Sequence, residues 1–206
     1  MKYIKMQKNE IKVTAAALLI MAIIYYTAEP KEILALLVPA AVHELGHLTA
    51  LKILGLRIRE FRLDAKGLCI NYCGHTGELG HILCAAAGPA AGFIYAYFAS
   101  KYGTGTDSSF LCLSAGVSFI LSVFNLLPAV PLDGGRIAAR ISVLLFGEKT
   151  GAVLAAGISF AVAIAVLAAG LWLMFGNRGT ALLIFAIWLL FYQESPKGIV
   201  KRREIL

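Results

Sequence analysis

Long apolar runs are the feature of this sequence that most constrains its fold. A helix needs about 20 mostly apolar residues to cross the hydrocarbon core of a bilayer, and several runs here reach that length. Of 206 residues, 59% are apolar and 15% are charged, whereas a soluble domain averages roughly 45–50% and 25%. So few polar residues cannot make a water-facing surface. We therefore expect an α-helical polytopic membrane protein.

Six of these runs are expected to be transmembrane helices. They are residues 11–28, 33–54, 79–100, 109–127, 152–175 and 180–192. A shorter run, residues 137–146, contains Arg140 and is expected to be a cytoplasmic or interfacial helix. With no second soluble domain, residues 1–206 are expected to form a single transmembrane domain.

The distribution of basic residues predicts how the chain is oriented. With a cytoplasmic N-terminus, 16 of the 19 lysines and arginines fall in cytoplasmic segments, and the other side keeps Lys31, Lys101 and Arg178. The positive-inside rule describes this asymmetry. Both termini are therefore expected in the cytoplasm. The net charge of +7 then reflects loops facing an anionic leaflet and gives no reason to expect nucleic acid.

Residues 56–72 alternate between apolar and polar positions. The apolar positions are Leu56, Ile58, Phe61, Leu63, Leu68, Ile70 and Tyr72, with a polar break at 64–67. This pattern predicts a small β-hairpin associated with the membrane. A two-stranded hairpin alone is marginally stable, so it needs the helices, the membrane or a bound peptide to complete it.

The second apolar run contains His43-Glu44-Leu45-Gly46-His47, an H-E-x-x-H pattern for which chance predicts about 0.003 matches in this chain. Residues four apart share one helix face, so both imidazoles can reach one metal ion. Glu44 stands beside them, placed to take a proton from water. Ionisable groups inside a span cost at least roughly 2.5–3.5 kcal/mol each, which favours a functional site over a hydrogen-bonded helix contact.

Asp133 is the candidate for a third metal ligand. It lies in residues 125–136, where two prolines and two glycines interrupt helical hydrogen bonding after the fourth apolar run. Irregular backbone at membrane depth is tolerated only where protein or water covers it. Alone, this segment would be interpreted as an interfacial loop. Combined with the histidine motif, it is interpreted as the source of a carboxylate ligand.

The histidine motif together with Asn125, Pro128 and Leu132-Asp133-Gly134 resembles the site-2 protease family of intramembrane zinc metalloproteases, over most of the chain. The branch it most resembles includes the stage IV sporulation protease that processes pro-sigma-K. The resemblance implies that His43, His47 and Asp133 bind Zn²⁺ and that Glu44 is the general base and acid. It implies that Asn125 positions the substrate or stabilises the oxyanion.

The resemblance further implies that Asn125, Pro128 and Gly88 contact the substrate. That substrate would be a membrane-associated protein, such as a pro-sigma factor, cut at or within the cytoplasmic side of the bilayer. Membrane-embedded regulators would be further partners. Gly92 stands where the family has an asparagine, which puts a polar role at that position in doubt. No CBS or PDZ domain is expected.

Two other functions are compatible with these residues. In a membrane transporter or channel, His43, Glu44 and His47 would line an ion path, although the sequence has no second carboxylate cluster and no inverted repeat. An inactive scaffold would be expected to have lost part of the motifs, which are intact.

Residues that flank the spans are expected to have simpler roles. His75 and His81 are expected in interfacial or capping positions at the third span, whose N-terminus Glu78 is expected to cap. Five aromatic residues are expected at the membrane interface or against lipid. They are Tyr25, Tyr26, Trp172, Trp188 and Tyr192.

Overall fold

The structure is a computed structural model that describes residues 10–13, 25–26, 28–64, 67–74, 76–176, 179–193 and 195–196. Its elements in chain order are β1 (Glu10–Val13), α2 (Pro30–Ile53), β2 (Arg57–Asp64), β3 (Gly67–Cys73), α3 (Glu78–Gly105), α4 (Ser109–Asn125), α5 (Asp133–Phe146), α6 (Glu148–Phe175) and α7 (Ala181–Phe191).

Three of these helices, α2, α3 and α6, are long and apolar enough to cross a membrane. The helices α4, with 17 residues, and α7, with 11, are apolar but shorter. The expectation of six full spans is therefore met for three helices in the part of the chain described. The expected first span lies mostly outside that part, and its start is corrected, because residues 11–13 belong to β1.

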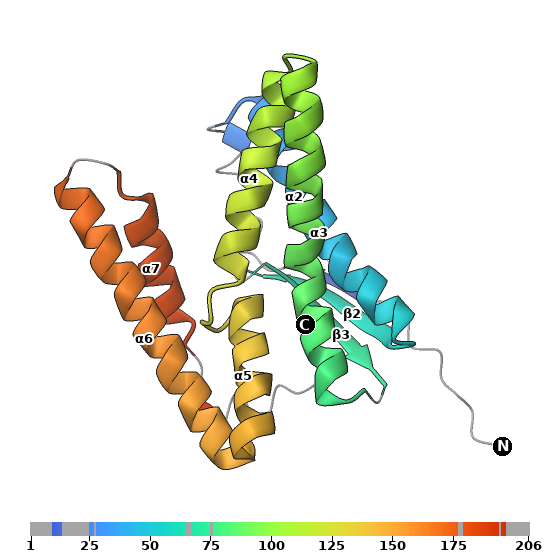
Figure 1. Ribbon diagram of the computed structural model, residues 1–206, viewed down its shortest axis with the longest axis vertical. Coiled ribbons are helices and arrows are strands. Elements are labelled where there is room, and N and C mark those ends of the chain that lie inside the picture. Colours follow the sequence, from blue (N-terminus) through green and yellow to red (C-terminus); the bar gives the residue numbers. More distant parts are fainter. Residues whose placement is uncertain are drawn as a thin grey trace.

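The helices form two groups joined by α5 (Figure 1). The helices α2, α3 and α4 pack against one another, while α6 and α7 form a separate pair. Helix α5 packs on both α3 and α6. It begins at Asp133, earlier than the expected position 137. The site described below lies where α5 begins, between the two groups.

Small residues allow α2, α3 and α4 to approach closely. A Cβ atom at Gly46 of α2 would lie 2.5 Å from the carbonyl oxygen of Ala87 in α3, and one at Gly92 of α3 would collide with the Ser122 hydroxyl of α4. The Ser118 hydroxyl donates to the Gly92 carbonyl at 2.8 Å. Close packing through small residues, with hydroxyls bonding between helices, is typical of membrane helix contacts.

The expected hairpin is present, as β2 paired antiparallel with β3, and Phe61 stands opposite Ile70. Strand β1 adds to the other edge of β2, parallel to it, which makes a three-stranded sheet in the order β1-β2-β3. The turn residues 65–66 lie outside the described part. Ile70 and Tyr72 are buried against Leu51 and other residues of α2 and α3, and this contact fixes the sheet beside these helices.

Two polar contacts fasten the sheet and α5 to the first turns of α3. The Tyr72 hydroxyl lies 2.6 Å from Nδ1 of His81, and Arg140 of α5 donates to Glu78 at 3.1 Å. Glu78 was expected to cap α3, but the N-cap is Gly77 and no side chain caps it by a hydrogen bond; Glu78 instead connects α3 to the helix that carries Asp133. His75 lies outside the described residues.

Candidate metal centre

Helix α2 carries both histidines on its buried face. The helix starts at Pro30 behind a capping box, in which Glu29 and Glu32 each accept a backbone N–H. The two histidines follow in its second half, one turn apart. His43 is 5% exposed and His47 is 4% exposed. Two nearly inaccessible imidazoles on one helix face need polar partners, because an unpaired buried polar group is costly.

Asp133 reaches these imidazoles because the chain between α4 and α5 folds back on itself. Residues 126–132 are not helical, and Asp133 is the first residue of α5. Glycine is required directly after it, since a Cβ at Gly134 would collide with the backbone of Leu126, and one at Gly135 with the backbone of Ala129. The Asp-Gly-Gly sequence therefore packs the carboxylate-bearing end of α5 against the broken segment.

Side chains of α6 and of the residues after α7 hold the broken segment. The backbone N–H of Val130 donates to the Ser159 hydroxyl oxygen at 2.9 Å. That hydroxyl donates in turn to the Gln193 side-chain oxygen at 2.7 Å. Val130 is three residues before Asp133, so this chain of bonds fixes the approach of the carboxylate to the histidines.

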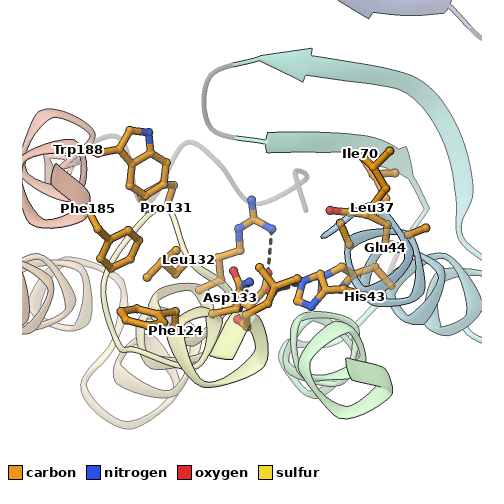
Figure 2. A pocket seen from close by; sticks show the side chains of 16 residues that line it. Leu37, His43, Glu44, Ile70, Phe124, Pro131, Leu132, Asp133, Phe185 and Trp188 are labelled. Carbon is orange, nitrogen blue, oxygen red and sulfur yellow. Dashed lines mark hydrogen bonds and ion pairs between the residues drawn. The ribbon is translucent and has the colours of Figure 1, made fainter. Parts of the chain in front are cut away.

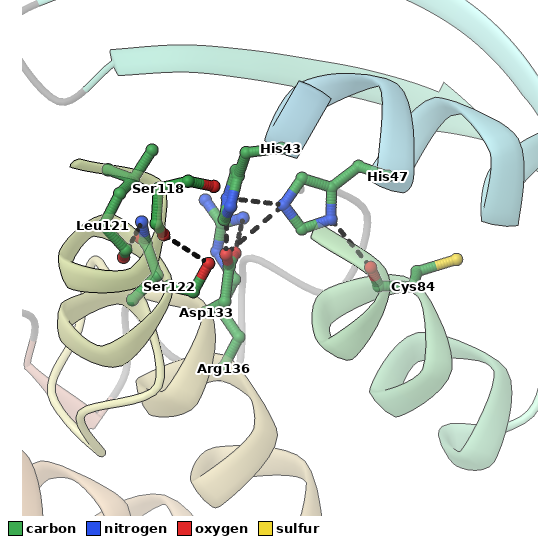
Figure 3. Close-up of polar contacts among 9 residues, drawn as sticks. His43, His47, Cys84, Ser118, Leu121, Ser122, Asp133 and Arg136 are labelled. Carbon is green, nitrogen blue, oxygen red and sulfur yellow. Dashed lines mark hydrogen bonds and ion pairs between the residues drawn. The ribbon is translucent and has the colours of Figure 1, made fainter. Parts of the chain in front are cut away.

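The three candidate ligand atoms form a nearly equilateral triangle (Figure 3). Oδ2 of Asp133 lies 3.1 Å from Nε2 of His43 and 3.3 Å from Nε2 of His47. The two Nε2 atoms are 3.2 Å apart. Zinc bonds of roughly 2.0–2.1 Å in tetrahedral geometry separate neighbouring ligand atoms by about 3.3–3.4 Å. The triangle therefore fits one zinc ion, with the fourth position left for water or substrate.

Neighbouring groups orient these ligands. Nδ1 of His47 lies 2.7 Å from the Cys84 carbonyl oxygen. Because a carbonyl only accepts, Nδ1 carries the proton and Nε2 presents its lone pair, the arrangement typical of zinc-bound histidine. Arg136 donates to Oδ1 of Asp133 at 3.4 Å, which leaves Oδ2 for the imidazoles.

The charge state of Asp133 also suits a cation. Burial by itself raises the pKa of Asp133, but the close contacts of its carboxylate with the His43 and His47 imidazoles and the positive charge of Arg136 outweigh it, so that its pKa lies well below the ordinary value. With its proton on Nδ1, Nε2 of His47 presents a lone pair to Oδ2 of Asp133 at 3.3 Å, and no hydrogen lies between these two acceptors. A divalent cation satisfies all three ligand atoms.

A pocket of about 650 Å³ opens beside this cluster (Figure 2). Glu44, Asn125 and Arg136 line it together with the three candidate ligands. The half-buried Glu44 directly follows His43 and lines the same pocket as His43, His47, Asp133 and Arg136. A carboxylate therefore stands beside the metal position and lines a space large enough for a small ligand.

Not every residue expected to contact substrate lines this pocket. Asn125 does, and one of its amide N–H groups donates to the Leu121 carbonyl at 3.0 Å. Pro128 and Gly88 are not among the described residues that line it. Gly88 instead lies against His47, since a Cβ there would be 2.5 Å from Cε1 of that imidazole.

Comparisons with known proteins agree with this geometry. No family model matches the chain. It is 27% identical over 171 residues to zinc metalloprotease MJ0392 of Methanocaldococcus jannaschii, which covers 81% of this chain and 49% of that protein. The chain thus spans about half the length of that relative. Its structure resembles the site-2 protease from Methanocaldococcus jannaschii with a TM-score of 0.67 and 24% identity, covering 89% of this chain and 88% of the other.

This chain has the fold of a site-2 protease. Three aromatic residues that the sequence did not point to as part of the site line its pocket. They are Phe124, Phe185 and Trp188. Trp188 was expected against lipid or at the membrane interface. Helix α7 consists only of apolar residues, so no periodic pattern distinguishes its pocket-facing side from its other sides.

Proposed function

We propose that this chain is a zinc metalloendopeptidase that hydrolyses a peptide bond of a membrane-associated protein, at or within the cytoplasmic side of the bilayer. The convergence of His43, His47 and Asp133 beside the Glu44 carboxylate in one pocket carries this proposal. The similarity to a protein named as a zinc metalloprotease and the site-2 protease fold support it.

His43, His47 and Asp133 would hold the zinc ion. When bound, zinc polarises the scissile carbonyl and makes water a stronger nucleophile by lowering its pKa. Glu44 removes a proton from the attacking water as the new carbon–oxygen bond forms. It then gives that proton to the leaving amine as the carbon–nitrogen bond breaks, so one carboxylate serves as base and then as acid.

Asn125 is assigned to the substrate carbonyl. Its side chain lines the pocket, and only one of its two amide N–H groups is used by Leu121. The remaining N–H supplies a neutral donor for the negative charge that develops on the carbonyl oxygen. Gly88 contributes by leaving room for the His47 imidazole, and Pro128 by interrupting helical hydrogen bonding in the segment that leads to Asp133.

The sheet provides a way to hold the substrate extended. Strand β3 is an edge strand whose outer side has no partner strand in the described part of the chain, and its residue Ile70 lines the pocket. A peptide that pairs with this edge exposes its backbone carbonyls, whereas a helix hides them. The similarity of residues 125–136 to the sporulation branch makes a pro-sigma factor the first substrate to test.

Co-expression of the full chain with a candidate pro-sigma substrate tests the function. We expect the wild type to cleave it and the Glu44→Gln variant to retain zinc but not cleave. Glu32→Gln is the matched control, because it makes the same change in the same helix and glutamine also suits a capping box. Cleavage by Glu44→Gln at the wild-type rate would refute the role of Glu44. Metal flux into vesicles without any cleavage would refute the protease function and favour an ion transporter.

A further inference from the structure

The pocket beside the candidate metal centre has two chemically different parts (Figure 2). Its polar part holds Glu44, Asn125 and Arg136 next to the candidate ligands. Its far wall is aromatic, built from Phe124 of α4 with Phe185 and Trp188 of α7. In Figure 2 these rings stand across the pocket from Leu37 and Ile70.

The aromatic wall is a continuous surface. The rings of Phe124 and Phe185 meet edge to face with centroids 4.8 Å apart, and those of Phe185 and Trp188 are stacked at 5.8 Å. Phe185 and Trp188 are three residues apart and so share one side of α7. Leu189, one turn after Phe185, is buried against Ala129, Leu132 and Ala163, and Phe185 and Trp188 also pack against this cluster, which holds the wall in place.

The wall is next to the polar part because one short segment joins them. Pro131 and Leu132 line the pocket directly before Asp133. A ligand that places a polar group on Glu44 and Asn125 therefore places its adjacent atoms against the rings of Phe124, Phe185 and Trp188. A hydrocarbon chain such as a lipid tail would fill the aromatic part but would offer no polar group to the Glu44 carboxylate or to the second amide N–H of Asn125. A peptide satisfies both parts, through its backbone and one side chain.

From this arrangement we propose that Phe124, Phe185 and Trp188 form a binding subsite for one large apolar side chain of the peptide, adjacent to the bond that is cut. This inference rests on the proposed protease function for the identity of its ligand. Because burying a large aliphatic or aromatic side chain contributes about 1.5–3 kcal/mol, a leucine or phenylalanine at that position binds roughly ten- to hundredfold more tightly than alanine.

The two tryptophans of the chain make this testable without measuring cleavage. Trp188 lines the pocket, whereas Trp172 lies on α6 and is 71% exposed. Trp172→Phe leaves only the pocket tryptophan, and Trp188→Phe leaves only the exposed one as the matched control. Both are made in the zinc-loaded full chain with Glu44→Gln, in detergent. The probe is a blocked tetrapeptide of alanines with one 4-nitrophenylalanine, which quenches tryptophan fluorescence.

We expect saturable quenching of Trp188 and only weak, linear quenching of Trp172 by probe dissolved in the micelle. The leucine version of the peptide should displace the probe at a concentration at least tenfold lower than the alanine or aspartate version. Phe185→Ala should reduce that preference, while Phe191→Ala, on an 85% exposed position of the same helix, should not.

Equal quenching of both tryptophans would overturn the proposal, since the probe would then merely enter the micelle. Equal competition by the leucine, alanine and aspartate peptides would also overturn it. Saturable, leucine-selective binding by a chain that cleaves nothing would refute the protease and keep the subsite. Efficient cleavage without selectivity for leucine would keep the protease function and refute the subsite.

Discussion

Replacing Gly88 with alanine tests how closely the candidate metal centre depends on its packing. Gly88 faces the His47 imidazole from α3, and a Cβ there would lie 2.5 Å from Cε1, 2.8 Å from Cδ2 and closer still to Nε2. Carbon atoms in ordinary contact are about 3.5–4.0 Å apart, so the ring must move by roughly 1 Å.

That movement should weaken metal binding more than folding. The obstructing atoms belong to a side chain, which can turn aside, and alanine is better than glycine in a helix by about 1 kcal/mol. A displaced ring, however, loses its 2.7 Å contact with the Cys84 carbonyl and leaves the triangle of donors. Loss of such supporting contacts typically costs 10–100-fold in metal affinity, or about 1.4–2.7 kcal/mol.

The assay is zinc affinity of the purified chain, measured by competition with a chromophoric chelator, together with the thermal unfolding midpoint of the metal-free form. Gly116→Ala is the control, because Gly116 lies in α4 with nothing within 4 Å of its Cβ position. Gly88→Ala should lose affinity while unfolding near the wild-type temperature. Wild-type zinc affinity in Gly88→Ala would refute the assignment of His47 as a ligand held in place by this contact.

Two further predictions concern Asp133 and Ser159. Zinc at 100 times its dissociation constant should stabilise the wild type by about 2.7 kcal/mol. The Asp133→Asn variant should purify with less zinc, and zinc should raise its unfolding temperature less than that of the wild type. An equal rise in the two proteins would remove Asp133 from the ligands. Ser159→Ala leaves the buried Val130 N–H without its acceptor, which costs about 1–3 kcal/mol. The unfolding temperature of this variant should therefore fall below that of the exposed control Ser100→Ala. Equal unfolding temperatures would show that the Ser159 hydrogen bond does not hold the broken segment.

Local patterns in the sequence predicted the parts of the site that depend on neighbouring residues. The four-residue spacing of His43 and His47 is a property of one helix, and the alternation of Phe61 and Leu63 is a property of one strand. The bounds of these elements differ from expectation by a few residues. The expected single domain and the orientation of the termini remain predictions.

Local patterns failed where a residue's role depends on a distant segment. Nothing around Trp188 distinguishes a pocket wall from a lipid contact, because every residue of α7 is apolar. The parallel strand β1 was also missed, since its pairing with β2 joins segments about 50 residues apart. In the same way, Glu78 was expected to cap α3, and its contact with Arg140 was not foreseen.

The sequence by itself determined that the chain has long apolar helices and that one of them carries two histidines and a glutamate within about one helical turn. These properties follow from composition and from the 3.6-residue repeat of a helix. Only the tertiary structure decided that Asp133 meets those histidines and that aromatic rings line the same pocket. Such contacts depend on how the helices pack and how residues 126–132 fold back, because the donor atoms come from positions 90 residues apart.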